Sequence, residues 1–174
     1  MKKHREEKSI TLALALRELL KHDPIEKITV DQICREAAVH RSTFYRYFQD
    51  KYDLLNYAFD KIWLEKIDED DIVDSIILLI FKEKDIFRNI SINNNNNLLY
   101  WIMVEMVTEK ILVASQNDRL HNIKWIEETV LQATDPKLAA NMIAGAFLTL
   151  LFEWVDSNYQ MDPKELSDFV RHLH

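Results

Sequence analysis

A single glycine, Gly145, is the feature that most constrains how this chain of 174 residues can fold. Dinucleotide-binding and phosphate-binding loops need several glycines at fixed spacing, because the backbone there must approach phosphate closely. The chain also has only three prolines, so the turn signals that separate the strands of a sheet are sparse. The sequence therefore predicts an all-α protein and excludes enzymes that cradle a nucleotide in a glycine-rich loop.

Composition narrows the class of protein further. Apolar residues make up 48% of the chain, which is enough for a substantial core. The lone Cys34 excludes a disulfide framework within one chain, and we expect it to be a small core residue. Charged and polar positions interrupt the N-terminus, and no apolar run approaches the roughly 20 residues of a membrane span. These features predict a cytoplasmic protein that uses no metal, cofactor or membrane.

Charge is distributed unevenly along the chain. Residues 1–51 contain 11 Lys/Arg and 8 Asp/Glu, a net charge of +3, whereas the remainder contains 11 and 21, a net charge of −10. Only the N-terminal third has the sign of charge that would favour a polyanion, and +3 alone is common on solvated surfaces. A motif is needed before this imbalance indicates nucleic-acid binding.

The N-terminal third has the helical pattern of a helix-turn-helix unit. Apolar residues recur at helical spacing over residues 8–20, and a short helix follows with Thr29 as its cap. Residues 41–48 form a third helix, and Asp50 is placed to cap a fourth that begins near Lys51. A long helix followed by two short ones that a tight turn joins is typical of this motif.

The third helix has two distinct faces. Phe44 and Phe48 are four residues apart, so they share the inward face and fill a small core. The outward, N-terminal side of such a helix presents its side chains to base edges in the major groove. This side holds Arg41, Ser42, Tyr45 and Arg46, whereas Thr43 and Tyr47 share another face. Lys51 adds a positive charge and backbone N–H groups suited to a phosphate.

The segment ITVDQICREAAVHRSTFYRYFQDKYDLL, residues 28–55, resembles the DNA-binding domain of the TetR/AcrR transcriptional regulators. The pattern of that family runs T-V-x-x-I-A-x-x-A-G-V-S-x-x-T-F-Y-x-Y-F-x-x-K-x-x-L, and the match is dense and colinear. The resemblance implies a bacterial regulator that binds double-stranded DNA at a near-palindromic operator. The residues that it places at DNA are Thr29, His40, Arg41, Ser42, Thr43, Tyr45, Arg46, Tyr47 and Lys51.

Two positions depart from the family pattern. Ala38 stands where the family has Gly. If the turn needs a positive φ at this position, the Cβ of alanine would destabilise it by on the order of 1 kcal/mol. His40 replaces the usual Ser at the cap of the third helix, which weakens that cap or makes His40 available to DNA. Neither departure removes a side chain that faces the groove.

Pattern alone guides the remainder of the chain. We expect the fourth helix to continue through residues 52–67 and another to span 72–82, with a break at 68–71 and a loop at the five-Asn run 93–97. Residues 98–115 and 136–154 read as two long core helices. The predicted domains are therefore 1–51, which binds DNA, and 52–174, which binds an effector and dimerises.

The small residues of the second long helix predict a close helix-helix contact. Glycine within a helix costs about 0.5–1 kcal/mol, so close approach by a neighbouring helix would explain Gly145. The stretch AGAFLTLLFEWVDSNYQMDPKEL is also similar to the penultimate helix of many TetR-type ligand domains, whose last two helices form a homodimeric bundle. This resemblance implies a homodimer interface that includes Ala144, Gly145 and Leu151.

The two long helices are rich in Trp, Met and Phe and contain only Lys110 and Lys137 as bases. A buried anion needs paired cationic donors, so an apolar or aromatic ligand is the predicted effector. Its candidate contacts are Tyr100, Trp101, Met103, Trp125, Met142 and Phe147, although these residues are equally explained as core.

Three classes of function follow. The first is a homodimeric repressor that a small apolar ligand releases from DNA. The second is an activator or adaptor on the same scaffold that responds to a protein partner. The third is a helical enzyme, which is disfavoured because the sequence shows no recognisable metal-binding or nucleophile constellation.

Overall fold

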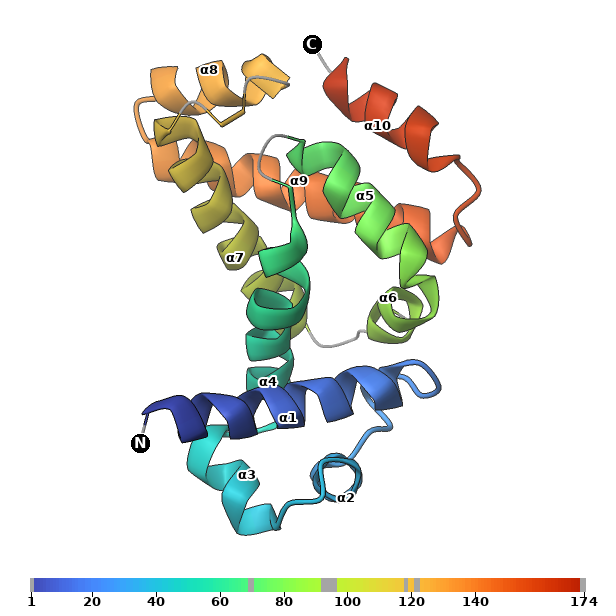
Figure 1. Cartoon of the computed structure of the whole chain (residues 1–174). Helices are drawn as coiled ribbons and strands as arrows, with labels where there is room; N and C mark the ends of the chain where they lie inside the picture. The colour runs from blue at the N-terminus through green and yellow to red at the C-terminus, as the bar shows by residue number, and fades with distance from the viewer. Residues whose placement is uncertain (1, 69–70, 92–96, 118, 121–122, 173–174) are drawn as a thin grey trace. The chain divides into compact units, whose positions relative to one another are not determined.

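The computed structural model describes residues 2–68, 71–91, 97–117, 119–120 and 123–172, and within these ranges every regular element is a helix (Figure 1). The all-α prediction is therefore confirmed. The chain forms two compact units: Met1–Lys66 with Glu83–Asn95, and Ile67–Lys82 with Asn96–His174. The first unit extends beyond residue 51, and the functional division at that residue stays a prediction.

The first unit is built around its N-terminal helix. Its elements are α1 (Lys2–Leu20), α2 (Val30–Glu36), α3 (Arg41–Tyr47), α4 (Lys51–Ala58), the π-helical turn η1 (Phe59–Trp63), the 3-10 turn η2 (Leu64–Lys66) and α6 (Lys84–Ser91). Helix α1 packs against α2, α4 and α6, and α2 packs against α3. In Figure 1, α2 (light blue) and α3 (cyan) lie on one side of α1, and α4 meets α1 from the other side.

Local sequence explains where the short helices begin. Thr29 caps α2 in a capping box, because its hydroxyl accepts from the Gln32 backbone N–H and the Gln32 side chain accepts from the Thr29 N–H. Asp50 caps α4 by accepting from the N–H groups of Tyr52 and Asp53. Both predicted caps are confirmed. The cap of α3 is weaker, since the His40 side chain makes no capping hydrogen bond.

The turn between α2 and α3 forces Ala38 into the left-handed region. Its φ is +50°. The Ala38 N–H donates to the carbonyl of Arg35 at 3.1 Å and the Val39 N–H to that of Cys34 at 2.9 Å, which is the hydrogen-bond pattern of a Schellman motif. Glycine is the usual residue at this position of the motif, because a Cβ is strained there.

Replacing Ala38 by Gly is therefore expected to raise the free energy of unfolding by about 0.5–1 kcal/mol, because the relieved strain exceeds the extra entropy of glycine in the unfolded chain. Urea denaturation followed by circular dichroism measures the change. The adjacent Ala37, with a φ of −78°, is the matched control. Ala37→Gly should destabilise the protein by a similar amount, and equal signs for the two substitutions would contradict the strain argument.

The second unit consists of α5 (Ile72–Lys82), α7 (Asn97–Gln116), α8 (Lys124–Gln132), α9 (Pro136–Asp156) and α10 (Pro163–Arg171). Helices α7 and α9 pack along each other, α8 packs on both, and α10 packs on α5. The centre of the α7–α9 contact is a buried cluster of Val104, Ala144 and Leu148, with Tyr100 and Phe152 packed against it. Both long helices contribute to this core as predicted, but each also has large exposed apolar side chains, such as Trp101 of α7 and Met142 of α9.

The fourth predicted helix is interrupted. It was expected to continue through residue 67, but the α-helical hydrogen bonding ends at Ala58 and gives way to η1 and η2. The structure also contains three short helices that the sequence pattern did not predict: α6, α8 and α10. Asn97 begins α7, and residues 93–96 of the predicted Asn-rich loop lie outside the described residues.

Helix α9 differs from one expectation. It has 21 residues, and an 18-residue window within it has a mean hydropathy of 1.6, so it is long and apolar enough to cross a membrane, although no segment was expected to meet that requirement. Seven of its side chains are buried within the chain: Ala140, Ile143, Ala144, Leu148, Leu151, Trp154 and Val155. Helix α9 packs against α7 and α8 within the second unit, and 39% of its apolar window is buried there.

Candidate nucleic-acid interface

The predicted division of α3 into an inward and an outward face is confirmed by burial. Phe44 and Phe48 are buried, with their ring centroids 5.9 Å apart. Arg41, Ser42, Tyr45 and Arg46 are all exposed, whereas Thr43 and Tyr47 are half-buried. The aromatic rings beneath α3 therefore hold the helix in place while four polar side chains face outward.

The guanidinium of Arg41 is held by two neighbours. Its Nη1 donates to Asp31 Oδ1 at 2.9 Å, and its Nη2 donates to the Tyr45 hydroxyl at 3.3 Å. Its Cζ also lies 5.5 Å from the centroid of the Tyr45 ring, a cation–π distance. The hydroxyl of Tyr45 and the carboxylate of Asp31 raise the pKa of Arg41 above its usual value, so it stays charged at every accessible pH.

Asp31 is a polar neighbour that the sequence reasoning missed. It lies in the first turn of α2, and ten residues separate it from Arg41. No helical spacing connects the two residues, because the turn at Ala38 brings them together. An acidic residue near the start of α2 was the only available signal, and it is equally explained by the helix dipole.

Arg46 contrasts with Arg41. It is exposed in the last turn of α3, and within the described part of the chain no ion pair to it is recorded. Thr29 and His40 are exposed at the caps of α2 and α3, where Thr29 already serves the capping box. The predicted contacts of all these residues with DNA stay predictions.

Lys51 has a structural role that the sequence did not show. Its ammonium donates to the backbone carbonyls of Ile25, Glu26 and Ile28 at 2.8, 3.0 and 3.0 Å. These bonds use all three N–H donors of a lysine side chain, so the side chain ties the loop after α1 to the start of α4. Partial burial lowers the pKa of Lys51, against the opposing effect of Glu26. Its predicted contact with a phosphate stays a prediction.

Lys51→Met is expected to lower the free energy of unfolding by about 1–2 kcal/mol, because three charge-assisted hydrogen bonds are lost and three carbonyls lose their partner. Thermal denaturation measures the change. Lys27→Met is the matched control, since Lys27 is exposed and has no recorded side-chain bond within the described residues. A Lys51 variant as stable as the Lys27 variant would contradict the structural role.

The residues predicted at a dimer interface are largely used within the chain. Ala144 and Leu151 are buried in their own unit, so packing explains them without a second copy. Gly145 lies at the α7–α9 contact, where the Tyr100 hydroxyl donates to its carbonyl at 3.1 Å. A Cβ on Gly145 would lie 3.5 Å from the Tyr100 hydroxyl oxygen, an ordinary contact, so alanine would fit there.

The six candidate ligand contacts are not brought together as one set. Tyr100 and Met103 pack against the α7–α9 cluster. Trp101 and Met142 are 59% and 66% exposed. Trp125 and Phe147 are half-buried, and the indole N–H of Trp125 is buried without a hydrogen-bond partner. The assignment of these residues to an effector site stays a prediction.

Comparison with known proteins finds a family model that matches part of the first unit. Residues 13–58 match the family model of the bacterial regulatory proteins of the tetR family. The HTH-type dhaKLM operon transcriptional activator DhaS of Lactococcus lactis subsp. lactis (strain IL1403) is 33% identical over 58 residues. That match covers 33% of this chain and 31% of DhaS, so it spans about a third of its relative.

Two solved structures resemble the chain over almost its whole length. One is NalD, the secondary repressor of the MexAB-OprM multidrug efflux pump in Pseudomonas aeruginosa, with a TM-score of 0.54 and 17% identity over 95% of this chain and 93% of NalD. The other is the fatty acid degradation regulator FadR from Bacillus halodurans, with a TM-score of 0.51 and 20% identity over 95% and 93%. Both likenesses concern the fold.

The matched family model covers α2 and α3, whose geometry is that of a helix-turn-helix. The relative and the similar solved structures agree with this assignment. They also agree with the expectation that the chain is not an enzyme, because this family is one of regulatory proteins. The TetR/AcrR resemblance of residues 28–55 is thereby confirmed by the match of residues 13–58 to the model of the bacterial regulatory proteins of the tetR family.

Proposed function

We propose that this chain is a transcriptional regulator that inserts α3 into the major groove of double-stranded DNA. The observation that carries the proposal is the exposure of Arg41, Ser42, Tyr45 and Arg46 on one side of a helix whose other side is anchored by buried Phe44 and Phe48. Arginine fits the acceptors of guanine, and hydroxyl groups fit either bases or phosphates. The chain acts in the cytoplasm, where bacterial DNA is accessible.

Repression is the sign of regulation that we propose. NalD, whose likeness spans both units, is a repressor by its description. The second candidate is an activator or adaptor whose second unit responds to a protein partner, and one observation favours activation: DhaS is described as an activator. The DhaS match covers 58 residues, a third of this chain, whereas the NalD likeness covers 95% of it. The sign of regulation is measured with a reporter gene placed behind an operator that the chain selects from random duplexes. Deletion of the regulator should raise reporter expression if it is a repressor and lower it if it is an activator.

The proposed effector is a small apolar molecule that binds the second unit. Helices α7 and α9 contain no Arg, and their two bases are Lys110 and Lys137. The ammonium of Lys137 lies 2.9 Å from a carboxylate oxygen of Glu105 and 3.5 Å from one of Glu109, so its charge is already paired. An anionic effector would find little cationic support on these helices. Tyr100, Trp101, Met103, Trp125, Met142 and Phe147 remain the proposed apolar contacts.

A homodimer is proposed because a regulator with one recognition helix per chain reads a near-palindromic operator with two copies. Leu138, Met142, Ala146 and Thr149 recur every three to four residues on α9 and are all exposed, beside the half-buried Gly145. This face, which we call the exposed α9 stripe, adjoins the predicted interface residues Ala144 and Leu151.

The exposed α9 stripe is tested with Met142→Glu. We expect sedimentation to show monomer at low micromolar concentration, where the wild type is dimeric, because a buried unpaired carboxylate opposes association. Leu131→Glu is the matched control, since Leu131 is an exposed apolar residue of α8. A Met142 variant that dimerises as the wild type does would place the interface elsewhere.

Binding to DNA is tested by selecting duplexes from a random library with the full-length chain. We expect a near-palindromic sequence with half-sites about 10 base pairs apart, or a multiple of that, and an affinity that falls steeply with salt. Arg46→Gln should weaken binding to the selected duplex, whereas Lys82→Gln, which removes an exposed charge from α5, should not. Equal effects of the two substitutions, or no selection of sequence, would contradict the proposal.

A further inference from the structure

The ion pair between Asp31 and Arg41 lies on the side of the motif that is proposed to face DNA. A carboxylate on such a surface is unfavourable, because it repels the phosphates. The pair is also exposed, with 59% of the Arg41 side chain and 61% of the Asp31 side chain accessible, so it contributes little to the stability of the fold. The dipole of α2 favours an acidic residue in its first turn, but that preference does not require the hydrogen bond between Asp31 and Arg41.

The geometry of the pair points to another role. Asp31 holds Nη1 of Arg41 from α2, while Tyr45 holds Nη2 and offers its ring from α3. A guanidinium has five N–H donors, so these two hydrogen bonds leave three for another acceptor. Its planar fork is thereby fixed on two sides, and fixing a donor before binding reduces the entropy that binding costs.

Charge compensation favours a base over a phosphate as that acceptor. A free arginine at a protein–DNA interface is attracted by every phosphate, which adds affinity for all sequences alike. The carboxylate of Asp31 cancels most of this attraction at Arg41, but it leaves the remaining N–H donors able to bond the O6 and N7 acceptors of guanine. Arg46, whose charge no recorded ion pair compensates within the described residues, is the contrasting case on the same helix.

We propose that Asp31 is a positioning residue for base readout, which holds Arg41 toward a guanine edge and keeps it from the phosphate backbone. This inference rests on the proposed binding of α3 in the major groove. It assigns the two arginines of α3 different tasks: Arg41 supplies preference for one base pair, and Arg46 supplies affinity that depends on salt. Weaker non-specific binding is then the means by which Asp31 raises specificity.

The test measures two quantities for the full-length chain: the slope of log K against log salt, and the preference at each base pair of the selected duplex. Asp31→Asn keeps the shape of the side chain and removes its charge. We expect the slope to steepen by about 0.9 per released arginine, and the preference at one base pair to fall about tenfold. Asp31→Ala should give the same two changes, so the result does not depend on one variant folding.

The arginine variants identify the base pair and serve as controls. Arg41→Gln should abolish the preference at the base pair that Asp31→Asn affects, while leaving the salt slope nearly unchanged. Arg46→Gln should instead flatten the slope by about 0.9. Asp31→Glu, which restores a carboxylate, should return the slope to its wild-type value. A merely structural role of Asp31 would move the melting temperature and neither of these quantities.

Each outcome decides the proposal. If Asp31→Asn and Asp31→Ala strengthen binding to all duplexes equally and leave every base preference unchanged, Asp31 acts only as a repelling charge and the proposal is wrong. The same holds if the slope does not change. If the wild type selects no sequence, the proposed function itself fails. If the wild type selects a sequence and Arg41→Gln keeps the same base preferences, only the proposed role of the Asp31–Arg41 pair is wrong.

Discussion

Phe44→Ala is expected to lower the free energy of unfolding of the first unit by about 3–5 kcal/mol, the usual cost of deleting a buried phenylalanine side chain. Phe44 is 0% exposed, and its ring lies between those of Tyr45 and Phe48, at centroid distances of 5.3 and 5.9 Å. Because α3 has only seven residues, it cannot persist without this anchor. Binding to the selected duplex should be lost together with the stability.

Tyr45→Ala is the matched control for that substitution. It removes the neighbouring aromatic ring from the exposed face of α3, so the free energy of unfolding should change by no more than about 0.5 kcal/mol. Urea denaturation followed by circular dichroism measures both variants. Equal destabilisation by the two substitutions would show that the inward face of α3 does not anchor the helix.

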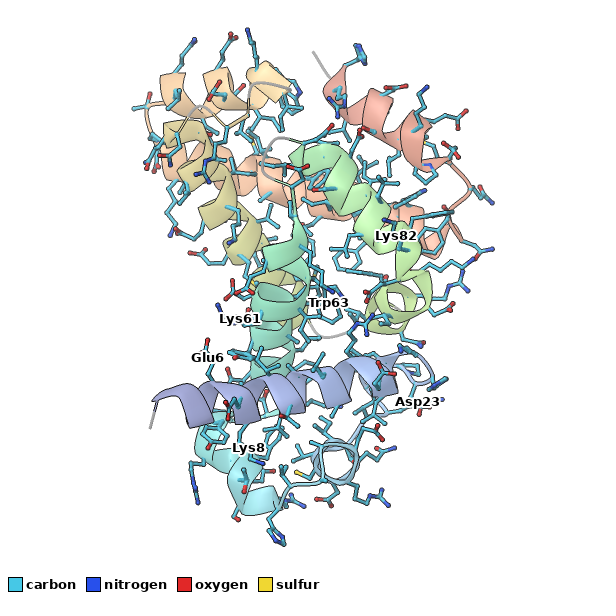
Figure 2. All side chains as sticks on the ribbon, viewed as in Figure 1. Glu6, Lys8, Asp23, Lys61, Trp63 and Lys82 are labelled. Carbon is cyan, nitrogen blue, oxygen red and sulfur yellow. The ribbon has the colours of Figure 1, made fainter. Side chains whose placement is uncertain are left out.

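Glu83→Gln is expected to lower the free energy of unfolding by about 2–3 kcal/mol. The Glu83 carboxylate accepts from Arg17 of α1 at 2.8 and 3.1 Å and from the indole N–H of Trp63 in η1 at 2.8 Å. Glu83 directly precedes α6, so these hydrogen bonds link the start of α6 to α1 and η1. Trp63 is labelled in Figure 2. Removal of the charge leaves Arg17, which is 24% exposed, with only the more exposed Glu18 as a recorded ion-pair partner among the described residues.

The contribution of Glu83 depends on pH. Burial alone would raise the pKa of Glu83, but the hydrogen bonds from Arg17 and Trp63 outweigh it and hold this pKa below its usual value. A lowered carboxyl pKa stabilises the folded state above the pKa of the unfolded chain, about 4.3, and this stabilisation is lost as the pH falls through the folded pKa. The difference in stability between the wild type and Glu83→Gln should therefore be full at pH 7 and shrink below about pH 4.

Glu18→Gln tests whether any carboxylate near Arg17 has this effect. Glu18 lies 3.3 Å from Arg17 Nη1 and also pairs with Lys21, but 47% of its side chain is exposed. We expect a change of no more than about 1 kcal/mol, as for other exposed ion pairs. If Glu18→Gln were as destabilising as Glu83→Gln at pH 7, the enclosed position of Glu83 would not be the cause.

The DNA-binding motif was the part of the fold that sequence predicted best, because its signals are local. The Thr29 and Asp50 caps act within three residues, and the spacing of Phe44 and Phe48 determines the inward face of α3. Even the strained turn could be predicted, since Ala38 occupies the position of a family glycine and has a φ of +50°. Chemistry confined to one or two turns of helix can be read from neighbouring residues.

Contacts between distant parts of the chain were not predictable in the same way. The bonds of Lys51 to carbonyls around Ile28, and of Asp31 to Arg41, depend on how the turns place the helices. Ala144 was expected at a dimer interface, but its burial in the α7–α9 core shows that small residues indicate close packing without identifying the partner. The interruption of α4 at Phe59 had no local signal either, because the apolar spacing continues through it.

Amide hydrogen exchange of the full-length chain, with and without its selected duplex, tests whether α3 binds DNA in a sequence-specific way. We expect slower exchange in residues 29–53 with the selected duplex, a smaller effect with a scrambled duplex of equal length, and no effect of comparable size in α8 (Lys124–Gln132). Protection confined to the second unit, or equal protection of residues 29–53 by both duplexes, would contradict sequence-specific binding through α3.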